Sequence, residues 1–186
     1  MYRTLSIAAF ILLGASGLSA FASANTSVLV HRDDEAGFIL QYPGNWSSVP
    51  ATHQRTRLKI VSERGAGSED CVVNVQIDET LRGVPLSESI RRMPDARTFQ
   101  RALRSAIPDA TVVESGKTYL SNQEAIFFVS VFTFRSAGLE IPVKMITIQT
   151  IRDRRVYTVG CRAREAEFDS LMPVFQIIFG GLLIKN

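Results

Sequence analysis

"GFILQYPGNWSSVP", residues 37–50, holds the features that decide how this chain begins to fold. Its first six residues form a short apolar run typical of a β-strand, and Pro43, Gly44 and Asn45 are typical of a tight turn. Trp46 then stands at the start of the returning segment, where a large ring can cover one end of a core. The alternative is a surface Trp46 that binds a carbohydrate or a peptide by stacking.

Six further segments have the length and apolar content of β-strands. They are residues 57–63, 71–77, 111–120, 124–134, 140–151 and 155–163. The last four are joined by connectors short enough for an antiparallel meander. Both alternating faces of residues 126–134 are apolar, which predicts a packed layer on each side of the sheet. We expect all seven strands, including residues 37–42, to join one sheet.

Two other segments follow the period of an α-helix. Apolar residues three or four positions apart recur at Leu86, Ile90 and Met93, and again at Phe99, Leu103 and Ile107. Pro94 and Pro108 should break this insertion into two pieces, and Asp95 can cap the second piece. Residues 165–181 predict a further amphipathic helix that ends at one of its two last glycines. The predicted fold class is α+β, an antiparallel sheet flanked by helices.

The N-terminal segment has the layout of a secretory signal peptide. Arg3 precedes an apolar run at residues 5–13, and residues 22–24 are small, as signal peptidase requires. We predict a signal peptide over residues 1–24, a polar lead-in over residues 25–36 and a single domain over residues 37–186. Export implies a periplasmic or secreted protein, and we expect no membrane span after signal cleavage.

The mature segment contains two cysteines, Cys71 and Cys161. In an oxidising compartment an even number of cysteines favours a disulfide. Two free thiols buried as small hydrophobic side chains are the alternative, because both residues lie on apolar faces of predicted strands. The pattern leaves both readings open.

Motifs of catalysis or cofactor binding are missing from the sequence. It has no nucleophile elbow, phosphate-binding loop or zinc-protease motif, and only two histidines, His31 and His53. His31 with Asp33 or Asp34 could bind a divalent metal, but a solvated charged segment explains these residues as well. The acidic residues at the start of the last predicted helix complement its dipole. We therefore expect no enzyme activity, no cofactor and no metal.

Charge is nearly balanced along the chain, with 21 Lys and Arg against 18 Asp and Glu, which does not favour a nucleic-acid partner. One basic feature is nevertheless organised. Arg97, Arg101 and Arg104 have the spacing of one helical face, offset from the apolar positions. They form either a solvated surface or a docking face for an anionic partner, since guanidinium groups bind carboxylates and phosphates in a fork.

The order of these segments resembles the PsbP/Mog1-like family. The matching residues are Phe38, Tyr42, Pro43, Trp46, Phe168, Phe175, Ile178 and Phe179. Gly180 and Gly181 depart from the Ser-Phe-like pair with which many relatives end the last helix. The resemblance implies an α-β-α sandwich and mostly non-catalytic work through protein partners, here in an exported bacterial member.

These observations give three hypotheses about function. The first is an exported accessory protein, monomeric and non-catalytic, that binds a protein partner through the three arginines or the Trp46 region. The second is a carrier of a small molecule or lipid in a pocket between sheet and helices. The third is a hydrolase whose triad is dispersed through the sequence and would include His53.

Overall fold

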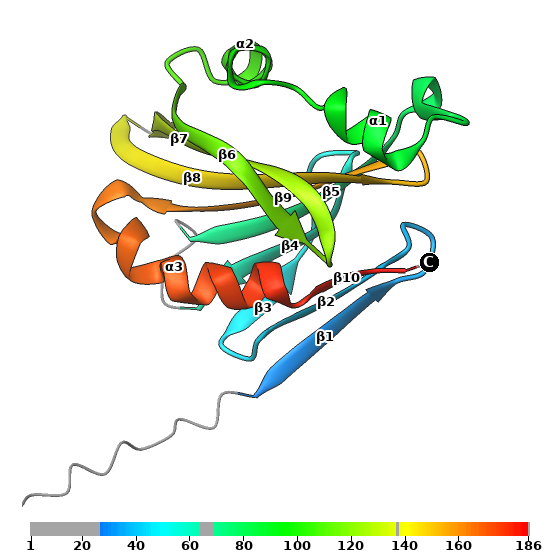
Figure 1. Cartoon of the computed structure of the whole chain (residues 1–186). Helices are drawn as coiled ribbons and strands as arrows, with labels where there is room; N and C mark the ends of the chain where they lie inside the picture. The colour runs from blue at the N-terminus through cyan, green and yellow to red at the C-terminus, as the bar shows by residue number, and fades with distance from the viewer. Residues whose placement is uncertain (1–26, 64–68, 137, 186) are drawn as a thin grey trace, which may run out of the picture.

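The computed structural model describes residues 27–63, 69–136 and 138–185. The predicted signal peptide lies outside these ranges. In the described chain the strands form two sheets, a large one of seven strands and a small one of three (Figure 1). Helices cover both faces of the large sheet, so the α+β fold class and the layer on each side of the sheet are confirmed.

The large sheet has the strand order β3-β4-β5-β9-β8-β7-β6, and every neighbouring pair is antiparallel. Its strands are β3 Trp46–Val49, β4 Thr56–Ser62, β5 Asp70–Ile77, β6 Thr111–Leu120, β7 Gln123–Ser136, β8 Leu139–Arg152 and β9 Arg155–Arg164. The predicted meander is therefore confirmed as β6 to β9. The sheet continues from β9 to β5, which places two segments far apart in the sequence side by side.

The first predicted strand does not join this sheet. It forms β2, Phe38–Pro43, in the small sheet of order β1-β2-β10. Alternation along β2 buries Phe38, Leu40 and Tyr42, but such alternation shows which face is covered and not which strand lies alongside. After Gly44 and Asn45 the chain enters the large sheet at Trp46, so the expectation of one sheet was wrong.

The small sheet also contains two strands that we did not predict. β1, Val28–Asp33, lies in the segment expected to be a polar lead-in and pairs antiparallel with β2. β10, Leu182–Ile184, pairs with the other edge of β2 directly after the last helix. Gly181 allows this return, because a Cβ atom there would lie 2.1 Å from the carbonyl oxygen of Gln41.

The helical insertion has the two pieces that the sequence predicts. A short 3-10 helix, η1 Glu79–Leu81, precedes α1, Leu86–Arg91, and α2, Ala96–Ala106. The Asp95 carboxylate accepts a hydrogen bond from the Thr98 backbone N–H at 2.8 Å and caps α2. α1 and α2 lie on one face of the large sheet, and α3, Glu165–Gly180, lies on the other (Figure 1). No helix in the described ranges is long and apolar enough to cross a membrane.

The main core lies between the large sheet, α3 and the small sheet. Phe168, Phe175, Ile178 and Phe179 project from α3 into it and are buried. The Trp46 ring meets the Phe175 ring edge to face, with 6.3 Å between ring centroids. The opposite face of the sheet, under α1 and α2, has only two small clusters of buried apolar residues.

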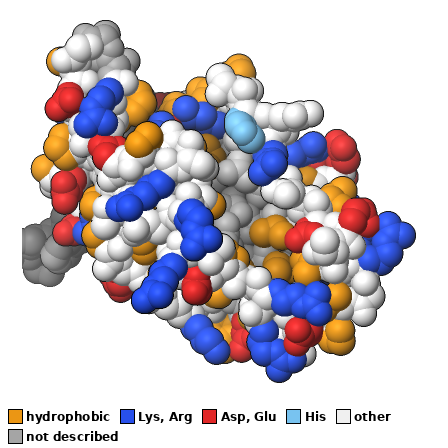
Figure 2. Space-filling view, turned by 90° about the horizontal axis from the view of Figure 1, so that it is seen from above, with side chains coloured by type: hydrophobic (Ala, Val, Ile, Leu, Met, Phe, Trp, Pro, Cys, Tyr) orange, Lys and Arg blue, Asp and Glu red, His pale blue; other side chains and the backbone are white. Residues whose placement is uncertain are grey.

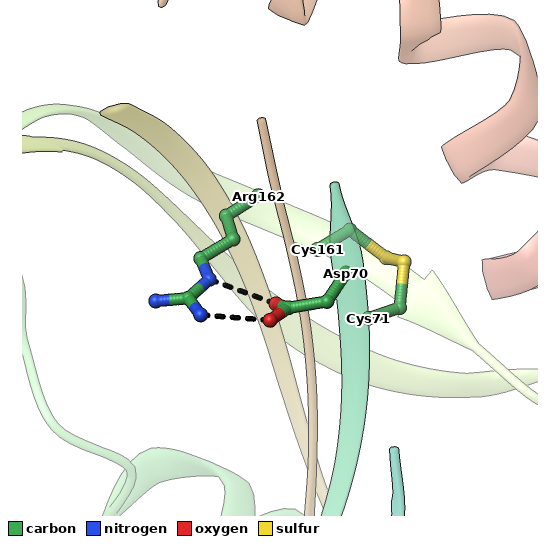
Figure 3. The surroundings of a disulfide bond; sticks show 4 residues. All are labelled: Asp70, Cys71, Cys161 and Arg162. Carbon is green, nitrogen blue, oxygen red and sulfur yellow. Dashed lines mark hydrogen bonds and ion pairs between the residues drawn. A yellow bond between two sulfur atoms is a disulfide. The ribbon is translucent and has the colours of Figure 1, made fainter. Parts of the chain in front are cut away.

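Cys71 and Cys161 form a disulfide across β5 and β9, where the two residues stand opposite each other in register. The bridge resolves the two sequence readings in favour of a disulfide. Its sulfur atoms lie on the α3 side of the sheet, while the neighbouring pair Asp70 and Arg162 lies on the other side of β5 (Figure 3). The guanidinium donates to both carboxylate oxygens, at 2.8 and 2.7 Å.

Candidate functional site

The three arginines singled out from the sequence lie on α2, and all three are exposed. Arg104 donates from Nε to the carbonyl oxygen of Ala110 at 2.8 Å. Within the described ranges, no carboxylate forms an ion pair with any of the three. α2 therefore presents three guanidinium groups that have no carboxylate partner in the described part of the chain.

Contacts on the opposite side of α2 orient these arginines toward solvent. The Phe99 ring stacks on the fully buried Phe128 ring of β7, with 4.0 Å between centroids and 4° between planes. Leu103 and Ile107 pack on a cluster that includes Phe132. None of the α2 residues is itself fully buried, so the helix rests on the sheet through one narrow apolar stripe.

Neighbouring arginines on this side of the molecule are paired with acidic residues. Arg91 and Arg92 of α1 both bind Glu88, and Arg135 of β7 binds Asp109 and Glu140. Figure 2 views this side and shows Lys and Arg side chains spread across it, with acidic side chains between many of them. α1 and α2 therefore differ in whether their arginines have a carboxylate partner in the described ranges.

The carboxylate of Asp95, which caps α2, lies in the positive electrostatic field of Arg97 and Arg101. The pKa of Asp95 is lowered, first by the hydrogen bond from the Thr98 backbone N–H and also by the charges of Arg97 and Arg101. Asp95 is the acidic residue that this helix carries at its start, and its oxygens already serve the cap. Asp95 therefore lies close enough to Arg97 and Arg101 to offset part of their positive charge.

Trp46 is not a surface residue. Its side chain is 2% exposed and packs in the main core beside Phe175. This burial favours the interpretation of Trp46 as a cover for one end of the core over stacking on a ligand, because the ring is not accessible.

The histidines lie in separate places. The His31 ring faces the Phe38 ring at 5.8 Å between centroids, and Nδ1 of His53 accepts a hydrogen bond from the Arg55 backbone N–H at 3.1 Å. In the described part of the chain, no hydroxyl group donates to either ring, and no three acidic, histidine or cysteine residues are grouped as a metal site would require. Asp169, at the start of α3, pairs with Lys144.

Two pockets flank α1; sequence reasoning expected a pocket between sheet and helices but identified none of their lining residues. One, of about 450 Å³, is lined by residues of the α1–α2 connection and of β6 and β7, including Met93, Tyr119 and Ile126. The other, of about 580 Å³, lies between the η1–α1 connection and the turn from β8 to β9. Each pocket takes its walls from several separate segments, so no local pattern in the sequence indicates it.

Comparison with known proteins shows similarity at the level of structure. No family model matches the chain, and no curated protein matches its sequence. The solution structure of CyanoP, the PsbP of the cyanobacterium Synechocystis, has a TM-score of 0.59 at 13% identity and covers 92% of this chain and 98% of its own. LpqN, a Mycobacterium tuberculosis protein described as involved in cell envelope biogenesis, has a TM-score of 0.53 at 13% identity, with coverages of 89% and 88%.

The third comparison is with Mog1p, the Ran-binding protein of Saccharomyces cerevisiae. Its TM-score is 0.53 at 9% identity, and the match covers 86% of this chain and 96% of Mog1p. All three matches extend over most of both chains. The chain therefore has a PsbP/Mog1-like fold.

Proposed function

We propose that this chain is an exported, non-catalytic accessory protein that binds an acidic protein partner through α2. The observation that carries the proposal is the set of exposed arginines on α2, Arg97, Arg101 and Arg104, none of which is paired with a carboxylate in the described chain. Guanidinium groups bind carboxylates in a fork and raise both the specificity and the rate of association with an acidic surface.

Two observations support a function outside the cytoplasm. The N-terminal segment has the layout of a signal peptide, and Cys71 and Cys161 are bridged, as is common in exported proteins and rare in the cytosol. Among proteins of this fold, LpqN is described as involved in cell envelope biogenesis and Mog1p as Ran-binding. Mog1p supports protein binding as a use of this fold, although a shared fold does not transfer a partner.

The test is crosslinked capture from the native envelope with three forms of the protein. These are the wild type, Arg97→Glu with Arg101→Glu, and a control with Arg55→Glu and Arg164→Glu. The control reverses the same number of exposed charges, but Arg55 lies in a loop before β4 and Arg164 is the last residue of β9, just before α3. We expect the control to capture the same partner as the wild type and the α2 variant to lose it.

The same three forms are then mixed with vesicles of anionic phospholipid. Equal capture by all three forms would contradict the proposal, as would a binding partner without an acidic surface. Binding to vesicles that depends on Arg97 and Arg101, without a captured protein, would replace the protein partner with a membrane surface.

A further inference from the structure

The pocket of about 580 Å³ beside α1 is lined by apolar residues, by the buried polar residues Ser89 and Gln123, and by arginines. Leu81 and Ile151, both buried members of one apolar cluster, are part of the apolar lining, and Leu86 of α1 lines one side. This volume lies in the range of pockets that hold small organic ligands. The pocket shares no lining residue with α2, so it is separate from the proposed protein-binding face.

Three arginines line this pocket: Arg82, Arg152 and Arg154. Arg82 and Arg154 are held by one carboxylate, because Nη2 of Arg82 lies 2.6 Å from Oε2 of Glu79 and Nη1 of Arg154 lies 2.8 and 2.7 Å from its two oxygens. The pKa of Glu79 is lowered by these bonds, first by that from Arg82 and then by that from Arg154, so the carboxylate stays ionised.

The backbone fixes Arg154 at the rim. Asp153 and Arg154 both have positive φ, at 47° and 67°, in the tight turn that joins β8 to β9. The carbonyl oxygen of Arg154 accepts a hydrogen bond from the Asp78 backbone N–H at 2.8 Å, which ties the turn to the start of η1. Since only Nη1 of Arg154 donates to Glu79, its other guanidinium nitrogens remain able to donate to a ligand.

Charge and shape together select the ligand. Arg152 pairs with Asp153, and Arg82 and Arg154 pair with Glu79, so the donors open to a ligand are the remaining N–H groups of Arg82 and Arg154, beside the apolar lining residues. A guanidinium binds a carboxylate or phosphate in a fork, while the apolar lining residues favour a hydrocarbon body. We propose that this pocket binds a small amphiphilic anion, with a carboxylate or phosphate head at Arg154 and an apolar body over Leu81 and Ile151.

The experiment is calorimetric titration of the full mature protein with decanoate, decyl phosphate, decanol and butyrate, each as a monomeric solute. Decanoate or decyl phosphate should bind at least tenfold more tightly than decanol, which lacks the charge, and than butyrate, which lacks the body. The ratio between decanoate and decyl phosphate tells a fatty-acid-like ligand from a phosphate ester. Equal binding of decanoate and decanol, or no binding of either anion, would overturn the proposal.

Variants locate the site. Arg154→Gln should weaken anion binding at least tenfold, and Arg82→Gln should weaken it less because Arg82 is more exposed, with 73% of its side chain accessible against 39% for Arg154. The matched control Arg97→Gln removes a charge from α2 and should leave anion binding unchanged. Unchanged binding in a folded Arg154→Gln protein would place the anion elsewhere and refute the assignment. Loss of partner capture by the α2 variant is independent of this result, so each proposal can fail alone.

Discussion

The face of the large sheet under α3 and the face under α1 and α2 bury very different sets of side chains. On the α3 side, four buried residues of the helix, Trp46 and the inner face of the small sheet form one continuous core. On the other side, α2 has no fully buried residue, and two pockets open beside α1. A third pocket, of about 540 Å³, lies on the α3 side between β2 and α3, so the two faces differ in their buried core and in the exposed arginines of α2.

Loss of the disulfide should have the largest effect on stability. Replacing Cys71 and Cys161 together with Ala opens a cross-link between residues 90 positions apart. Chain-entropy estimates for a loop of that length are about 4–5 kcal/mol. Urea unfolding of the variant and of the oxidised wild type measures the difference. A loss below about 1 kcal/mol would show that the unfolded chain gains little freedom when the bridge is removed.

The two faces of the large sheet can be compared directly by one substitution in the helix that covers each face. Phe175→Ala in α3 removes a fully buried ring and should cost about 3–5 kcal/mol in the free energy of unfolding. Phe99→Ala in α2 removes a half-buried ring stacked on Phe128 and should cost about 1–2 kcal/mol. Chemical denaturation measures both. Equal losses would mean that α2 anchors the fold as strongly as α3, and the comparison between faces would not hold.

Much of the structure on the two faces of the sheet can be predicted from local sequence patterns. The spacing of apolar residues and the position of Pro94, Asp95 and Pro108 predict both helical pieces, and the short connectors predict the meander. These features depend on residues close in sequence, so the sequence pattern is enough to predict the two helical pieces and the meander. The exposure of Arg97 and Arg101 likewise follows from their offset from Phe99.

What the sequence does not predict depends on contacts between distant segments. Nothing in the alternation of residues 38–43 distinguishes a place in the large sheet from a place in the small one. β1 is an edge strand with exposed Val28, Leu29 and Val30, so it lacks the alternating burial that marks a strand. The pairing of Glu79 with Arg154 joins residues 75 positions apart and appears only in the folded chain.

The contribution to stability of the ion pair between the two sheets, Asp33 with Arg57, should depend on pH. Nε of Arg57 in β4 lies 2.9 Å from the carboxylate of Asp33 in β1. Burial raises the pKa of Asp33, but hydrogen bonds from Arg57 and from the Ala36 backbone N–H outweigh it and hold the pKa below 3.8. A depressed pKa stabilises the fold above the unfolded value, and this contribution is lost as the pH falls through the folded value.

Unfolding measured between pH 7 and pH 2 tests this dependence. The wild type should lose stability as the pH falls below about 4, and Asp33→Asn should show a shallower loss over the same range. The effect should be smaller than those of the core substitutions, because Arg57 is partly exposed. Identical pH profiles for the two proteins would show that other carboxylates cause the acid sensitivity.

Charge reversal on α2 should have the smallest effect on stability. Arg97→Glu with Arg101→Glu changes exposed side chains without carboxylate partners in the described chain, so the free energy of unfolding should change by less than about 0.5 kcal/mol. Thermal unfolding by circular dichroism measures the change. A larger loss would indicate that these arginines stabilise the helix, and loss of partner capture would then have a structural cause.

Site-specific photo-crosslinking in the native envelope tests most directly which face binds. A photoreactive amino acid replaces Ser105, an exposed residue of α2 beside the arginines, in one variant and Ile177 of α3, which is 59% exposed on the opposite side, in another. We predict one defined protein adduct from position 105, with an acidic partner, and none of that mass from position 177. The same adduct from position 177 and its absence from position 105 would contradict binding through α2.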